Sequence, residues 1–303
     1  LAVKAVKQGA FDFVLKPWDN NKLIATLHAA FELRKSKQEN SVLREKNNTL
    51  KQQINKPGQA IIGESEAMKK IMELVKRVAI TDANILITGE NGTGKEIIAR
   101  EIHQLSNRRK ELMVSVDMGA ISESLFESEL FGHEKGAFTD AKESRAGKIE
   151  TAHKGSLFLD EIGNLSLSLQ AKMLAALQNR VVTRLGANNP IPINIRLISA
   201  TNKDLGQMIA NGLFREDLLY RINTITIEIP PLRERENDII LLAEYYLSNY
   251  ATKYGKPKLK LTTSAHKKLL QHQWPGNVRE LQHSIERAVI LSNEPALTAD
   301  DFN

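Results

Sequence analysis

The feature that most constrains this chain is a glycine-rich turn between an apolar run and a helical pattern. Ile85-Leu-Ile87 predicts a short buried strand, and a helix is expected after Gly94-Lys95, so strand, turn and helix follow one another as a phosphate loop requires. Glycines let successive N–H groups converge on a phosphate, and the lysine charge and the helix dipole add to the attraction. A turn without a ligand is the alternative. The residues expected to contact phosphates are Gly89, Glu90, Asn91, Gly92, Thr93, Gly94, Lys95 and Glu96.

Composition places the chain among globular proteins. Of its 303 residues, 42% are hydrophobic and 26% charged, and the lack of cysteine excludes disulfides and cysteine metal sites. No apolar run approaches the roughly 18 residues of a membrane span and no signal peptide is visible, so we expect a cytoplasmic protein without a membrane partner. The chain begins at Leu1 without an initiator Met, and we expect it to be part of a longer protein.

The net charge of +6 is concentrated in one polar segment. Residues 34–56 hold seven basic and two acidic residues, which accounts for +5 of it. This is weak evidence for nucleic-acid binding by the folded core, and a solvated helix face is the better interpretation. Leu43, Leu50 and Ile54 have heptad spacing, which is compatible with a short coiled coil or with a flexible linker that Pro57-Gly58 closes.

The pattern of apolar residues divides the chain into four parts. Residues 1–31 predict a helix, a strand and a helix, the last βα unit of a parallel sheet, and residues 32–58 are a helical linker. Residues 59–232 alternate strands with helices, and residues 233–303 predict helices only. The fold class is therefore α/β, a five-stranded parallel sheet covered by helices and followed by a small α-helical lid. Strands are expected at 85–87, 114–116, 156–161, 195–200 and 224–229, and helices at 66–79, 236–254, 262–272 and 276–291.

Two strands of this sheet end in polar residues suited to phosphate chemistry. Leu157-Phe-Leu-Asp-Glu161 is apolar until its two carboxylates, of which Asp160 can hold Mg²⁺ and Glu161 can polarise the attacking water. Acidic residues end many strands, but beside a phosphate loop the pair is a strong signal. Asn202 follows the fourth strand, where it can contact a γ-phosphate or orient water; a simple turn or cap is the alternative.

Three arginines are candidates for contacting the nucleotide, and two of them for stabilising transition-state charge. Arg215 and Arg221 lie six residues apart before the last strand, where either can reach the γ-phosphate of a neighbouring subunit. The alternative is that both are surface arginines paired with Glu216 or Asp217. Arg279, one turn into the helix that follows Trp274-Pro-Gly-Asn-Val, can reach back across the cleft to the nucleotide, so that phosphate binding would move the lid.

Together these motifs resemble those of AAA+ ATPases, and one further stretch narrows the family. Residues 129–141, Glu-Leu-Phe-Gly-His-Glu-Lys-Gly-Ala-Phe-Thr-Asp-Ala, resemble the signature of bacterial enhancer-binding proteins that activate sigma-54 RNA polymerase. A Glu after the phosphate-loop lysine is normal in that family, which accounts for Glu96 in place of the usual Ser or Thr. The resemblance covers residues 61–300. The Gly-Ala-Phe-Asp-Phe-Val-Leu-Lys16-Pro run resembles the end of a receiver domain, which indicates an NtrC-like response regulator.

The resemblance implies an ATPase that uses ATP and Mg²⁺ to remodel the closed sigma-54 polymerase complex as a hexameric or heptameric ring. Two residues depart from the family pattern: Asp140 replaces a usual Gly, and Asp117 replaces an Asn that restrains the catalytic glutamate. A carboxylate at 117 would repel Glu161, raise its pKa and make the resting state pH-sensitive. The loop implied to grip the sigma factor consists of Gly136, Ala137, Phe138, Thr139, Asp140 and Ala141.

Two other classes of function are possible on these motifs. A protein-unfolding or DNA-unwinding AAA+ motor would share the ATP site but would lack the Gly-Ala-Phe-Thr loop, so its presence at 136–139 decides against them. A purely DNA-binding regulator would need a recognition module. The family carries its helix-turn-helix after the ATPase, and the chain ends at Asn303 before one could fit, so we expect enhancer DNA to be bound only through a C-terminal domain absent here.

Overall fold

The structure is a computed structural model. It describes residues 19–55, 61–119, 123–256 and 259–302, together with residues 7, 11, 12 and 17. The chain forms two compact units, Leu1–Ile54 and Asn55–Asn303. The helix expected to end at Gly9, most of the strand expected at 11–15, Lys16 and the turn at Pro57-Gly58 lie outside the described residues.

The main element of the first unit is one long helix, α2 (Asn20–Ile54). It begins where a helix was predicted and runs without a break through residues 32–54 of the predicted linker, so these residues are helical. The side chain of Asp19 accepts a hydrogen bond from the Asn21 N–H at 2.8 Å, which caps the first turn. The side chains on which the heptad spacing depends are not described, and the coiled coil stays a prediction.

The second unit is built around a five-stranded parallel sheet, which confirms the predicted fold class. Its strands are β1 (Ile85–Thr88), β2 (Met113–Asp117), β5 (Ser156–Asp160), β8 (Arg196–Thr201) and β9 (Ile225–Glu228). Their order is β2-β5-β8-β1-β9, so β8 lies between the strand before the phosphate loop and the strand that ends in two carboxylates. Because the carboxyl ends of parallel strands share one edge, this order brings those motifs together.

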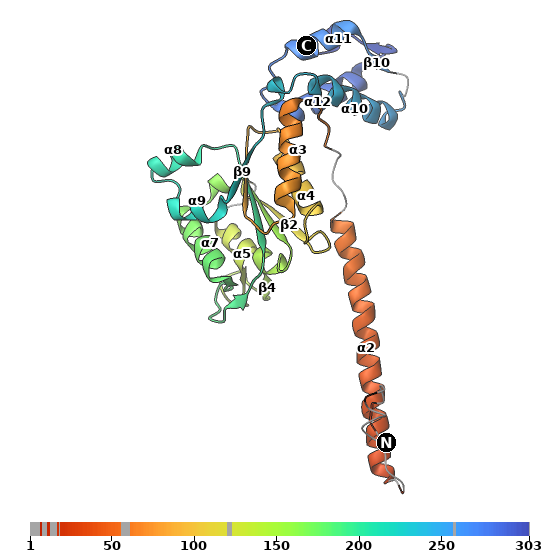
Figure 1. Ribbon diagram of the computed structural model, residues 1–303, viewed down its shortest axis with the longest axis vertical. Coiled ribbons are helices and arrows are strands. Elements are labelled where there is room, and N and C mark those ends of the chain that lie inside the picture. Colours follow the sequence, from red (N-terminus) through yellow and green to blue (C-terminus); the bar gives the residue numbers. More distant parts are fainter. Residues whose placement is uncertain are drawn as a thin grey trace. The chain divides into compact units, whose positions relative to one another are not determined.

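Both faces of the sheet are covered, as continuous apolar strands require. Ile85, Ile87 and Phe158 pack with α3 (Glu66–Ala79) and α4 (Lys95–Gln104) on one face. Leu86 and Leu157 point to the opposite face, where α5 (Glu123–Phe131), α7 (Leu167–Asn179) and α9 (Glu216–Ile222) pack. Figure 1 shows α3 and α4 on one side of the sheet and α7 and α9 on the other. The helices on this second face are α5 (Glu123–Phe131), α6 (Lys148–Thr151), α7 (Leu167–Asn179), α8 (Leu205–Ala210) and α9 (Glu216–Ile222).

Two short antiparallel pairs interrupt this plan. The strands β3 (Gly132–His133) and β4 (Arg145–Ala146) form the base of the insertion that carries residues 136–141. The strands β6 (Val181–Val182) and β7 (Ile191–Pro192) form the base of a second loop. The two insertions meet where Glu134 N–H donates to the Leu185 carbonyl at 2.9 Å. Strands of two residues are too short to show an alternating pattern, and neither pair was predicted.

The lid, the part of the chain after residue 232, has its own core around α10 (Asp238–Lys253), α11 (Thr263–Gln271) and α12 (Asn277–Leu291). The prediction that it is purely helical was wrong, because β10 (Lys260–Leu261) and β11 (Ala296–Leu297) pair in parallel. Asp238 joins the lid to the first residues of the α/β part: its carboxylate accepts from the N–H groups of Glu64 and Ser65 at 2.7 and 2.9 Å. Within the described residues no helix is long and apolar enough to cross a membrane.

Candidate active site

The glycine-rich turn has the backbone that a phosphate loop needs. Gly89, Gly92 and Gly94 have φ angles of 146°, 77° and 100°, a region that other residues rarely adopt. Gly94 begins α4 without a side-chain cap, so the first N–H groups of that helix face the turn unpaired by any cap. The Lys95 side chain is only 6% exposed, and its amino group donates to the carbonyl oxygens of Gly89 and Glu90 at 3.0 and 3.3 Å. Strand, turn and helix therefore follow one another as predicted.

The two carboxylates at the end of β5 lie beside this lysine. Glu161 has φ of 56°, a left-handed conformation that is unfavourable for a residue of this kind and is common at functional sites. Its Oε1 lies 3.6 Å from Lys95 Nζ, and its Oε2 accepts from the Asn202 N–H at 3.5 Å. Asn202 follows β8, so the ends of two neighbouring strands and the start of α4 meet at Glu161.

Of the two carboxyl groups at the end of β5, that of Asp160 has a raised pKa. Burial raises its pKa, the neighbouring Glu161 carboxylate raises it further, Lys95 opposes this, and Asp117 adds a smaller increase. Asp117 is the register partner of Asp160 across β2 and β5, and its own Oδ1 accepts from the Gly119 N–H at 2.8 Å. The charge at 117 therefore acts on Asp160, and its expected effect on Glu161 stays a prediction.

This arrangement suits a hard cation shared with a ligand. The described residues contain no group of three or more histidine or acidic side chains that could hold a metal alone. Mg²⁺ is commonly bound by one or two carboxylates with phosphate oxygens and water completing its shell. Asp160, a half-buried carboxyl that lines the same cleft as the phosphate loop, fits that role.

These groups line one cleft of about 640 Å³ that runs from the ends of the strands to the lid. Of the predicted site residues, Gly89, Glu90 and Thr93 do not line it, and among its described lining neither Arg215 nor Arg221 is found. The predicted residues that line it are Asn91, Gly92, Gly94, Lys95, Glu96, Asp117, Asp160, Glu161, Asn202 and Arg279. The cleft therefore unites residues from the loop, three strand ends and the lid.

Glu90 fastens the phosphate loop to the lid. Its carboxylate accepts two hydrogen bonds from Arg233, at 2.6 and 3.0 Å, and one from Asn277 Nδ2 at 3.0 Å. These bonds, led by that of Arg233, lower the pKa of Glu90 to about 2. The Asn277 amide also donates to the Asn91 carbonyl at 3.0 Å, and the Val278 N–H donates to Gly92 O at 3.0 Å. We refer to these contacts as the loop–lid clamp.

The clamp depends on close packing as well as on hydrogen bonds. A Cβ at Gly92 would lie 2.3 Å from the carbonyl oxygen of Gly276, so only glycine fits there. Beneath the turn, the buried Arg235 donates to the carbonyl oxygens of Thr93 at 2.8 Å and Pro230 at 3.0 Å. Burial lowers the pKa of Arg235 to about 10. The turn is thus held by two sets of lid contacts, those of Asn277 and Val278 and those of Arg235.

The arginines near the last strand have partners within the chain. Arg215, the residue before α9, donates to both carboxylate oxygens of Asp217 at 3.0 and 2.7 Å, and both side chains are exposed. Arg221, in the last turn of α9, donates to the Leu177 carbonyl at 2.8 Å. For Arg215 the structure has the pairing with Asp217 that sequence reasoning held as the alternative, and a role toward a neighbouring subunit stays a prediction.

The loop at residues 136–141 is a compact turn with an exposed aromatic tip. The Gly136 N–H donates to the Ala141 carbonyl at 2.8 Å, and the Ala141 N–H donates to Phe138 O at 2.9 Å. The Phe138 ring is 41% exposed and lies edge-on to His133, with ring centroids 5.0 Å apart. Thr139 and Asp140 are exposed beside it, and Ala137 packs against Gly186 of the second loop. The tip is presented to solvent by a folded base.

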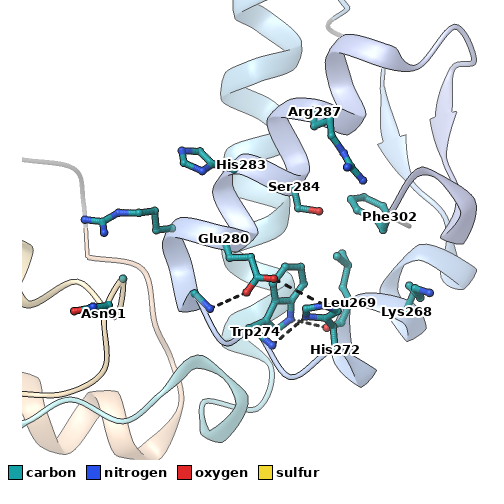
Figure 2. A pocket seen from close by; sticks show the side chains of 13 residues that line it. Asn91, Lys268, Leu269, His272, Trp274, Glu280, His283, Ser284, Arg287 and Phe302 are labelled. Atoms are coloured by element: carbon teal, nitrogen blue, oxygen red, sulfur yellow. Dashed lines mark hydrogen bonds and ion pairs between the residues drawn. The ribbon is translucent and has the colours of Figure 1, made fainter. Parts of the chain in front are cut away.

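A second hollow of about 530 Å³ lies on the lid beside Asn91 and Gly92. Figure 2 shows His283, Ser284 and Arg287 along α12, and Glu280 directed toward the turn that carries His272 and Trp274. Glu280 accepts from the Gly276 N–H at 2.8 Å and lies 3.9 Å from His272 Nε2. Glu280 therefore supports the turn that precedes the clamp residues Asn277 and Val278. Lys95, Asp160 and Glu161 do not line this second hollow.

Fold and cleft together define a phosphate-loop α/β domain with a helical lid, the arrangement of an AAA+ domain. Residues 61–228 match the family model described as the Sigma-54 interaction domain, and residues 233–303 match that of the AAA+ ATPase lid domain. The chain therefore belongs to the NtrC-like family of sigma-54-dependent regulators, which confirms the family predicted from residues 129–141.

Individual relatives agree with this assignment. The chain is 44% identical over 301 residues to the regulatory protein AtoC of Escherichia coli, covering 99% of this chain and 64% of the relative. It is 46% identical over 287 residues to the C4-dicarboxylate transport regulator DctD of Pseudomonas aeruginosa, covering 95% and 61%. The crystal structure of NtrX from Brucella abortus in complex with ADP has a TM-score of 0.76 at 35% identity, covering 100% of this chain and 67% of that one. The chain thus spans less than two thirds of the length of these curated relatives.

Several residues of the site were missed by sequence reasoning. The missed residues lie in the lid, far along the chain from the phosphate loop. They are Asn277 and Arg233 of the loop–lid clamp and Tyr246 and Gln282 of the cleft. For Asn277 a signal existed, because it belongs to the Trp-Pro-Gly-Asn-Val-Arg-Glu-Leu run that carries the family resemblance. The other three occur in ordinary amphipathic or polar stretches and give no signal of their own.

Proposed function

We propose that the chain is an ATPase that binds ATP with Mg²⁺ in the cleft and hydrolyses it to ADP and phosphate. The observation that carries this proposal is the meeting of Lys95, Asp160, Glu161 and Arg279, from three segments, around one cleft at the start of a helix. A carboxyl group with a perturbed acidity, here Asp160, beside a second carboxylate in a cleft is typical of catalytic sites. The binding of ADP and of ATP by NtrX from Brucella abortus supports the same ligand here.

The phosphates would be held mainly by backbone groups and by Lys95. The N–H groups at the start of α4, which no side chain caps, and those along the glycine turn would bind a phosphate. Lys95 would leave the carbonyl oxygens of Gly89 and Glu90 for the phosphate oxygens, a stronger charged partner. Asp160 would hold Mg²⁺, which neutralises charge that develops on the phosphates. Arg279 would add charge from the lid side.

Glu161 would act as the general base toward water. In the structure its carboxylate is engaged by Lys95 at 3.6 Å and by the Asn202 N–H at 3.5 Å. When Lys95 turns to a phosphate, one of these two partners is lost, and the carboxylate becomes available to accept a proton. Binding of ATP would therefore release the Glu161 carboxylate from Lys95, and the Asn202 N–H would keep that carboxylate oriented.

The active site would be completed by a neighbouring subunit in a hexameric or heptameric ring. Arg215 and Arg221 lie outside the cleft of their own chain, so they would contribute only to the cleft of another copy. Arg215 is exposed and its partner Asp217 is also exposed, so the pair can exchange at little cost in free energy. An arginine supplied in trans typically contributes about 10³–10⁵ in rate.

Hydrolysis would drive the remodelling of the closed complex of sigma-54 RNA polymerase. The exposed Phe138, with Thr139, offers an aromatic tip of the kind that concentrates binding energy. Asp140 adds a charge at that surface, where the family has glycine. The contact of residues 136–141 with sigma-54, and the division of the chain into a receiver remnant, a linker, an ATPase part and a lid, are parts of this proposal.

The test is the steady-state ATPase rate against protein concentration, for the chain, for Glu161→Gln and for Glu66→Gln as a matched exposed control. The rate per subunit should rise with concentration and vanish in Glu161→Gln, while ATP still binds. Glu66 forms an ion pair with Lys69 on the surface of α3, far along the chain from the cleft residues, and should be dispensable. A chain that binds no ATP would overturn the proposal, and a concentration-independent rate from a monomer would overturn the neighbouring-subunit step.

A further inference from the structure

The hollow of about 530 Å³ on the lid has an apolar floor and a basic rim. The acid among its described lining residues, Glu280, is engaged by the Gly276 N–H at 2.8 Å. Figure 2 shows Arg287 extending from α12 toward Phe302, so a cation stands beside apolar surface. Such a hollow fits a segment that joins an aromatic ring to a carboxylate. The floor is formed by Leu269, Trp274 and Phe302, and the basic lining residues are Lys268, His272, Arg279, His283 and Arg287.

The exposed face of α9 carries a ring and a carboxylate of this kind. Tyr220 is 75% exposed, more than any other large apolar side chain among the described residues. Its hydroxyl donates to the Glu216 carboxylate at 3.2 Å, one turn earlier on the same face of the helix. The next residue, Arg221, donates to the Leu177 carbonyl at 2.8 Å, so its charge is directed toward α7. An aromatic side chain this exposed is a typical anchor of a protein–protein contact.

The hollow and the cleft adjoin each other, because Asn91, Gly92 and Arg279 line both. In the proposed function Arg215, the residue before α9, enters the cleft of a neighbouring copy. Tyr220 lies five residues further along, about 7 Å on a helix that rises about 1.5 Å per residue. When Arg215 reaches that cleft, Tyr220 therefore arrives beside it, within reach of the hollow on the same lid.

We propose that the hollow on the lid of one copy of the chain receives Tyr220 and Glu216 of the next copy. The ring would pack over the apolar floor, and the Glu216 carboxylate would lie beside Arg287 on the rim. A second copy is the occupant that the molecule itself supplies, since α9 carries both the matching face and the arginine directed to the adjoining cleft. This inference rests on the proposed neighbouring-subunit step and names the surface on which the two copies meet.

The test measures self-association of the chain by sedimentation velocity with a non-hydrolysable ATP analogue present. Tyr220→Ala should raise the protein concentration for half-assembly about thirtyfold, the effect of an interfacial hot spot of about 2 kcal/mol. Leu291→Ala is the matched control, because Leu291 is 69% exposed on α12 and is not found in the described lining of the hollow or the cleft. It should assemble like the unmodified chain.

An exchange of charges identifies the hollow as the surface that receives α9. Glu216→Arg and Arg287→Glu should each weaken assembly about fivefold, the effect of an exposed ion pair worth about 1 kcal/mol. With both substitutions the charges are again opposite, so assembly should return to within about twofold of that of the unmodified chain. A lid that had lost its structure in Arg287→Glu would not be repaired by a change on α9, so this restoration separates contact from folding.

Two results would overturn the inference: Tyr220→Ala assembling like Leu291→Ala, or the doubly substituted chain assembling no better than either single variant. Assembly that depends on Tyr220 in a chain that binds ATP without hydrolysing it would refute the proposed ATPase and support this contact. A chain that hydrolyses ATP as a monomer at every concentration would overturn both the contact and the neighbouring-subunit step, while the proposed ATPase would stand.

Discussion

Asn277→Ala should be among the most destabilising single changes in the lid. The Asn277 side chain is fully buried, and its Oδ1 accepts from the Leu232 N–H at 2.7 Å. That N–H loses its acceptor in the variant, which costs about 1–3 kcal/mol. Two donated hydrogen bonds to Glu90 and Asn91 are lost as well, about 1 kcal/mol each before water replaces part of them at the exposed carboxylate.

The backbone adds to this cost. Asn277 has φ of 53°, a left-handed conformation that asparagine tolerates and alanine does not, at a further penalty of about 1 kcal/mol. The total loss in the free energy of unfolding is therefore about 3–5 kcal/mol, a large fraction of the stability of an ordinary domain.

Urea unfolding followed by tryptophan fluorescence would measure this loss, because Trp274 is buried in the turn that precedes Asn277. Asn249→Ala on the exposed face of α10 is the matched control, and it should change the free energy of unfolding by less than about 0.5 kcal/mol. A loss below about 1 kcal/mol for Asn277→Ala would refute the reasoning, since it would mean that the Leu232 N–H finds another acceptor.

Three further changes test other contacts. Asp217→Asn removes the exposed ion pair of Arg215, which is worth about 1 kcal/mol or less. Arg215 is then free to reach a neighbouring subunit, so the protein concentration for half-maximal ATPase rate should fall by up to about fivefold. An unchanged concentration would refute the idea that Asp217 competes for Arg215. Glu90 has a pKa lowered from 4.5 to about 2, chiefly by Arg233, so its contribution to stability is complete above pH 4.5 and lost as the pH falls toward 2. The difference in unfolding free energy between the chain and Glu90→Gln should shrink over that window, and a constant difference would contradict the clamp. Phe138→Ala should preserve ATPase activity and abolish transcription from a sigma-54 promoter in vitro; equal losses of both would remove the loop from the contact.

Much of the fold could be predicted because its signals are local. Ile85-Leu-Ile87 and Leu157-Phe-Leu159 are continuous apolar runs, typical of strands buried on both faces, and the helix at 66–79 has both an N-cap serine and apolar residues at helical spacing. The phosphate loop and the pair Asp160 and Glu161 are contiguous motifs, so their chemistry was visible without the structure. Strand order then brought them together.

The rest of the site could not be predicted because its partners are far apart in the sequence. Glu90 lies 187 residues from Asn277 and 143 from Arg233, and no local pattern links such positions. The pairing of Arg215 with Asp217 was weighed but not chosen, because spacing alone does not tell a surface pair from a residue that acts in trans. The β10–β11 pair escaped detection since each strand has only two residues.

The contacts of the loop–lid clamp indicate how phosphate binding would affect the lid. Lys95 is held by the carbonyl oxygen of Glu90, and the side chain of Glu90 is held by Arg233 and Asn277 of the lid. When Lys95 leaves that carbonyl for a phosphate, the backbone of the turn loses a charged donor at the residue that the clamp grips. The disturbance would therefore reach the lid through Glu90 itself. We expect the lid to respond to phosphate binding, because these contacts form a continuous path from Lys95 to the lid.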